Sequence, residues 1–181
     1  VLIALSFDGI REWNHYRTLV NEARGNIARE IADNRREIAI VLNGMEERRK
    51  HLENALKLAN EVLTTKKTSV RQVNLGFELA DVTASSWQTA ARTGALAHMD
   101  YSEVQRYERL YALQDLYVDR QRRGVEQLAS AMSILTGDPT LAPVNDLELF
   151  RQRLLEQLAG LSLEKGIGER LLEAYDRVTK E

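Results

Sequence analysis

Apolar side chains recur every seven residues over residues 8–64, and this heptad repeat constrains the fold more than any other feature. Counting core positions from Ile10 gives sixteen positions, of which twelve are apolar, whereas the overall hydrophobic fraction of 44% would place about seven there. The apolar positions are Ile10, Trp13, Val20, Ile27, Ile31, Ile38, Val41, Met45, Leu52, Ala55, Ala59 and Val62, and the polar ones are Arg17, Arg24, Asn34 and Arg48.

The repeat keeps its phase through Asn43 and Gly44, although this pair of residues is typical of a turn. A heptad repeat indicates a helix that packs along one face. The pattern therefore predicts a single helix of about 57 residues, ~85 Å long at 1.5 Å per residue. A helical hairpin broken at Asn43 is the alternative.

The segment 66–84 follows a different rhythm, because its apolar residues alternate with polar or small ones. No partner strand is evident elsewhere in the sequence, so we expect an extended loop that packs along the bundle. A short helix is expected to begin at Ser85, with Gln88 three residues later as in a capping box.

Two further long helices follow. Asp100 predicts the start of a third helix, which runs to about Thr136, with Gly137 as its C-terminal cap. Asn145, with Glu148 three residues later, predicts the start of the last helix. The predicted fold is all-α: an elongated antiparallel bundle with one very long N-terminal helix, two long helices and a short helix. Residues 8–181 form a single domain.

Residues 1–7 (VLIALSF) are apolar and are followed at once by charged sequence. Seven residues are too few to cross a bilayer, which needs about 20. They fit either the end of a truncated transmembrane helix or an ordinary buried helix start.

Helix lengths predict self-association. The third and fourth helices, of about 35 residues each, reach only ~52 Å. About 30 Å of the first helix is therefore left without a partner within the chain, and an exposed apolar stripe needs cover. We predict that other copies cover it, through Ile10, Trp13, Val20, Ile27 and Ile31.

Residues that could carry chemistry are sparse. The chain has no cysteine, and His15, His51 and His98 are far apart without a zinc-binding spacing. The net charge of −2, with acids and bases interspersed, argues against nucleic-acid binding. We expect no catalytic residues, no cofactor and no metal. One cluster of aromatic residues, Trp87, Tyr107 and Tyr111, is a candidate ligand pocket, although core packing is the more common role of such a cluster.

Two stretches share a wider pattern. Residues 1–37 combine an apolar helix end, a tryptophan-containing joint and a Leu/Ile-rich helix. Residues 85–116 contain Ser-Trp-x-x-Ala-x-x-x-Gly-Ala-Leu, then a Tyr-Ser helix cap and a Leu-Tyr pair. Together they resemble a family of bacterial single-pass membrane proteins, a domain of unknown function, over about 70 of the 181 residues.

The resemblance implies a transmembrane anchor ahead of Val1, a place in the bacterial inner membrane and a periplasmic helical domain. It transfers no activity. The leading hypothesis is a non-enzymatic, membrane-anchored structural or protein-interaction module of the bacterial envelope, which binds itself or another envelope protein. The alternative is a ligand-sensing periplasmic bundle with its pocket near Trp87.

Overall fold

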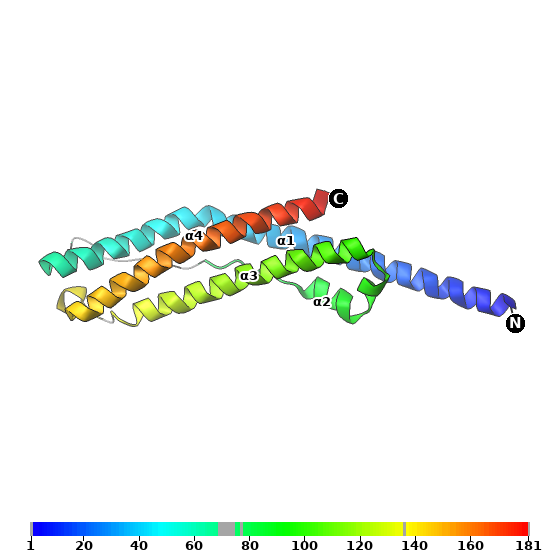
Figure 1. The fold of residues 1–181 in the computed structure, drawn as a ribbon, viewed down its shortest axis with the longest axis horizontal. Coiled ribbons are helices and arrows are strands. Elements are labelled where there is room, and N and C mark those ends of the chain that lie inside the picture. Colours follow the sequence, from blue (N-terminus) through cyan, green and yellow to red (C-terminus); the bar gives the residue numbers. More distant parts are fainter. Residues whose placement is uncertain (1, 69–74, 77, 136, 181) are drawn as a thin grey trace.

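The chain is an elongated all-α bundle in the computed structural model, which describes residues 2–68, 75–76, 78–135 and 137–180, with side chains described within 12–179. The elements are α1 (Leu2–Thr65), α2 (Ser85–Arg92), the 3-10 helix η1 (Ala95–His98), α3 (Tyr101–Met132), the 3-10 helix η2 (Pro139–Leu141) and α4 (Val144–Lys180). Figure 1 shows that α4 runs antiparallel to both α1 and α3 and packs against both. The predicted fold class is confirmed.

Helix α1 continues without interruption through Asn43 and Gly44, so the helical hairpin is the wrong alternative. Every apolar heptad position from Val20 to Val62 is buried. The heptad repeat therefore identifies the face of α1 that the rest of the chain covers.

Three of the four polar heptad positions of α1, Arg24, Asn34 and Arg48, meet partners from other elements. Arg24 donates two hydrogen bonds to the carboxylate of Glu103 on α3, at 2.8 and 2.6 Å. Arg48 forms an ion pair with Glu164 on α4 at 3.3 Å, and its side chain is 11% exposed. These polar residues sit at core positions because side chains distant in sequence neutralise them.

Helix α2 starts at Ser85 as predicted, but two other helix ends and the cap of α2 need correction. Helix α3 starts as expected, since the Asp100 carboxylate accepts hydrogen bonds from the first turn, but it ends at Met132 rather than near Thr136. Helix α4 begins at Val144, one residue before the predicted cap at Asn145, because the carbonyl of Pro143 accepts the first helical hydrogen bond from Leu147. In α2 the N-cap residue is Ala84, which makes no side-chain cap, so the expected capping box at Ser85 is not formed.

The N-terminal end of α1 projects beyond the other helices (Figure 1). Side chains from Glu12 to Thr18 are mostly exposed, and continuous burial begins at Val20. The predicted unpaired stretch reached as far as Ile31, whereas Ile27 and Ile31 are buried, and α2 and η1 also pack on α1. The prediction considered only the long helices and therefore left out α2 and η1.

The described residues between 66 and 84 form neither a helix nor a strand. Ala80 is buried, and Leu75 and Val82 pack against the main core. This part of the chain returns along the bundle as the expected extended loop, and its far end positions Thr83 and α2.

Candidate functional site

The three aromatic residues of the predicted pocket do come together, as a stack of rings. The ring of Trp87 lies 5.5 Å from that of Tyr111 at an interplanar angle of 13°, and 6.1 Å from that of Tyr107. Tyr111 is 3% exposed. Burial raises the pKa of both tyrosines. The rings pack against one another and against the core, which is the arrangement of a structural cluster.

Glu30 is the residue beneath this cluster that the sequence analysis missed. Its side chain is buried, and one oxygen accepts a hydrogen bond of 2.6 Å from the Tyr111 hydroxyl. The other oxygen accepts from the backbone N–H of Ser86 at 2.7 Å and from the Ser85 hydroxyl at 3.0 Å. A side chain of α1 thus supplies the N-terminal cap that α2 lacks locally.

Asn34, one turn further along α1, anchors the loop before α2. Its side-chain amide donates to the backbone carbonyl of Thr83 at 2.7 Å and accepts from the Thr83 N–H at 3.0 Å. The amide also donates to Gln114 on α3 at 3.0 Å, and Gln114 accepts from the Tyr175 hydroxyl on α4 at 2.6 Å. Buried polar groups are stable only when they are hydrogen-bonded, and this network meets that need with its own members.

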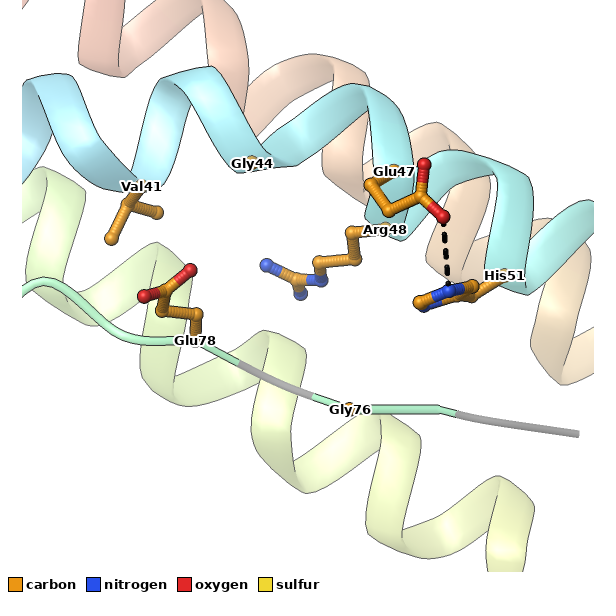
Figure 2. Close-up of a pocket in the computed structure, with 7 residues that line it drawn as sticks. All are labelled: Val41, Gly44, Glu47, Arg48, His51, Gly76 and Glu78. Carbon is orange, nitrogen blue, oxygen red and sulfur yellow. Dashed lines mark ion pairs between the residues drawn. The ribbon is translucent and has the colours of Figure 1, made fainter.

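A groove of about 450 Å³ lies between α1 and the returning loop, and Figure 2 shows it. Its lining residues are Val41, Gly44, Glu47, Arg48, His51, Gly76 and Glu78. The guanidinium group of Arg48 extends into the groove, and the imidazole of His51 lies 3.4 Å from the Glu47 carboxylate. Burial lowers the pKa of Arg48, and Glu164 holds the group from the α4 side.

Charged groups of both signs line this groove. Glu47 and Glu78 face Arg48 and His51, and Arg48 already has a carboxylate partner in Glu164. Of the described lining residues, none carries a hydroxyl or thiol nucleophile. The arrangement suits polar contact with a neighbouring surface better than covalent chemistry.

A second groove, of about 510 Å³, lies where α1 leaves the bundle. Its lining residues are Trp13, Tyr16, Arg17, Val20, Asn21, Arg24 and His98. The rings of Tyr16 and His98 stack at 3.8 Å, and Arg17 lies over the Trp13 ring at 5.3 Å. Trp13 remains 61% exposed.

The predicted self-association residues therefore divide into two groups. Trp13 is exposed on the projecting end of α1, whereas Val20, Ile27 and Ile31 lie in the chain's own core and present no free surface. Three of the five predicted residues are therefore not available on the surface of a single chain, and self-association itself stays a prediction. The side chain of Ile10 lies outside the described residues.

The described residues show neither a metal-ligand cluster nor a membrane-spanning stretch. No group of three or more potential metal-ligating side chains comes together among the described residues. Nor does any helix, as far as it is described, have a stretch long and apolar enough to cross a membrane. Residues 1–7, the predicted end of a transmembrane helix, lie outside the described side chains.

Comparison with known proteins returns no relative. No family model matches the chain, no curated protein is significantly similar, and no solved structure matches its fold. The resemblance to the bacterial membrane-protein family stays a prediction, and what is established is an all-helical protein in which the described residues form four α-helices.

Proposed function

We propose that this chain is a non-enzymatic protein-interaction module of the bacterial envelope, which self-associates through the projecting end of α1. One observation carries the proposal: α1 extends past the bundle and presents an exposed Trp13 beside a groove. Inside the bundle, by contrast, Glu30, Asn34 and Arg48 already have hydrogen-bond partners from the same chain.

The residue types at this end are those that dominate protein–protein interfaces. Trp, Tyr and Arg are enriched among the residues that contribute most to binding. Trp and Tyr bury large surfaces with little loss of conformational freedom. Trp13, Tyr16 and Arg17 supply all three within two helical turns. Arg17 is held over the Trp13 ring, so part of the surface is pre-organised.

Attachment to the inner membrane through the N-terminus, with the bundle in the periplasm, is the second part of the proposal. The apolar run at residues 1–7 supports it, and so does Trp13 on the projecting helix. Tryptophan and tyrosine are common where helices leave a bilayer. Self-association near a membrane gains from the high local concentration that an anchor provides.

Stacking of Trp87 on Tyr111 favours this function over the ligand-sensing alternative. A ligand pocket at this position needs open volume, and the two rings lie nearly parallel with their centres 5.5 Å apart. Their hydroxyl and carboxyl neighbours are committed to fixing α2.

Sedimentation equilibrium on the 181-residue chain tests the proposal. We expect a concentration-dependent dimer or larger oligomer, and Trp13→Ala should raise its dissociation constant by about tenfold or more. Leu141→Ala is the matched control, because Leu141 is 82% exposed at the opposite end of the bundle and should leave association unchanged. A monomer at every concentration, or equal effects of both substitutions, contradicts the proposal.

A further inference from the structure

Arginines line a third groove, which lies between α3 and α4. Its volume is about 350 Å³, and its described lining is Arg106, Arg109, Leu110, Leu113, Ala174, Arg177 and Val178. None of these lining residues is acidic. Arg109 and Arg177 are exposed, and neither forms an ion pair with a described residue. The groove is thus apolar at its floor and positively charged at its rims.

The same character continues along the bundle beyond this groove. Leu116 follows Leu113 on one face of α3 and is 52% exposed, and Leu163 on α4 is 57% exposed. The two leucines are level with each other, because Arg120 donates a hydrogen bond to the Gly160 carbonyl at 3.2 Å and fixes the antiparallel register. Helices α3 and α4 lie side by side (Figure 1), and Leu116 and Leu163 leave large apolar side chains exposed on these two helices.

The length and charge of this surface indicate what it binds. From Arg106 to Arg120 the surface extends about 21 Å, which is four turns of a helix. Arg170 adds a further exposed cation to the α4 rim and lies on the same helical face as Arg177. An amphiphile with one charged headgroup would neutralise only one of these arginines, whereas the arginines are distributed along both edges of the groove. The apolar floor, in turn, does not favour binding of the phosphate backbone of a nucleic acid.

We infer that the α3–α4 groove is a docking site for an acidic amphipathic helix of a partner protein. Apolar residues of that helix would lie over Leu113, Leu116 and Leu163, and its flanking carboxylates would pair with Arg109 and Arg177. The partner would add a further long helix to the three that pack in this bundle. The inference deepens the proposed interaction role by naming a second surface, separate from Trp13.

The probe is a synthetic, fluorescently labelled helical peptide of about 18 residues, with leucines on one face and glutamates beside them. Fluorescence anisotropy measures its affinity for the full chain. We expect Arg109→Glu combined with Arg177→Glu to weaken binding by at least about tenfold, because like charges then face each other. Leu116→Ser should weaken it as well, since an apolar contact is lost.

Matched controls separate this surface from general charge effects. Arg92→Glu combined with Arg151→Glu places the same total charge change on α2 and on the far part of α4, where both arginines are exposed. Leu141→Ser removes an exposed leucine elsewhere, and both control chains should bind as the unaltered chain does. A peptide with lysines in place of the glutamates should not bind. Thermal melting of each variant shows that the fold is retained.

Several results overturn the inference. These are no binding of the acidic peptide, equal binding by all variants, equal binding of the lysine peptide, or tighter binding of a single-stranded oligonucleotide or of anionic vesicles than of the acidic peptide. Self-association is measured on the same samples. The two proposals can fail separately. The arginine variants should lose peptide binding but keep their oligomers, whereas Trp13→Ala should lose its oligomers but keep peptide binding.

Discussion

The Glu30 carboxyl group and the Tyr111 hydroxyl, 81 positions apart in the chain, share a hydrogen bond of 2.6 Å. Glu30 belongs to α1 and Tyr111 to α3, and the same carboxyl group also accepts from the backbone of Ser86 at the start of α2. One buried side chain thus sets where three helices meet. Because an unsatisfied buried carboxyl group is strongly unfavourable, the arrangement also disfavours other positions of α2.

Tyr111→Phe should lower the free energy of unfolding by about 1–3 kcal/mol, because it leaves one buried oxygen of Glu30 without its donor. Urea denaturation monitored by circular dichroism measures the change. Tyr101→Phe is the matched control, since Tyr101 is 75% exposed and its hydroxyl contacts only Gln105 among the described residues. Equal losses from the two substitutions would argue against the role assigned to Glu30.

Stability should fall in alkaline solution. Burial raises the pKa of Tyr111, Tyr117 and Tyr175 above the ordinary tyrosine value of about 10. Below that pH these phenols are protonated in both the folded and the unfolded chain, so their contribution is fully present. Above it the unfolded chain releases protons that the folded chain retains, and the free energy of unfolding declines as pH rises.

Urea titrations between about pH 8 and pH 11 measure this decline. Tyr175→Phe should make it shallower, because one buried phenol no longer titrates, whereas Tyr101→Phe should leave the slope unchanged. A free energy of unfolding that is constant up to pH 11, or identical slopes in all three chains, would contradict the expectation.

Sequence periodicity predicted the burial of α1 well, because the heptad repeat depends on residues close together in the chain. The partners of its polar core residues were not predictable, since Arg24, Asn34 and Arg48 meet residues between 49 and 116 positions away. No local pattern announces such a pairing. Their position on an otherwise apolar stripe was the available signal that a buried partner exists.

The candidate sites, too, could be predicted from the sequence only in part. Tyr107 and Tyr111 are one turn apart on a predicted helix, and Trp87 precedes it on a short helix, so their meeting could be anticipated. The position of Glu30 below these rings could not be anticipated, because it depends on how α2 crosses α1. The packing of α2 and η1 on α1 was missed for the same reason.

The ion pair between Arg48 and Glu164 predicts an asymmetric response to substitution. Glu164→Leu should lower the free energy of unfolding by about 3–5 kcal/mol, because Arg48 keeps its charge in a site where its side chain is 11% exposed. Adding Arg48→Met to that variant should restore most of the loss, since two apolar side chains of similar volume replace a desolvated pair.

Guanidinium chloride denaturation of the four chains of this double-mutant cycle measures the coupling. Arg122→Met is the control, because Arg122 pairs with Asp119 on an exposed face and should leave the stability nearly unchanged. Additive effects of the two substitutions would show that the pair does not act as a unit.

Gly166 and Gly168, two residues apart on α4, should respond to alanine with opposite signs. A Cβ at Gly168 would lie 2.9 Å from a methyl carbon of Leu42 on α1 and 3.0 Å from the ring of Tyr117 on α3, whereas a Cβ at Gly166 meets no atom within 4 Å. Gly166→Ala should stabilise the chain by about 0.5–1 kcal/mol through helix propensity. Gly168→Ala gains the same propensity but should still destabilise the chain by about 1–3 kcal/mol, because the two neighbouring side chains must move.

Thermal and urea unfolding of both variants measures the difference in stability directly, because both sites lie on the same helix and gain the same helix propensity from alanine. Tyr117 is fully buried, so its ring cannot move out toward solvent. The strain therefore falls on the contact among α1, α3 and α4. Leu42→Ala should relieve part of the loss in the Gly168→Ala chain by opening space for the new methyl group. Two equally stabilised alanine variants would mean that the three helices do not meet as closely at Gly168 as the structure places them.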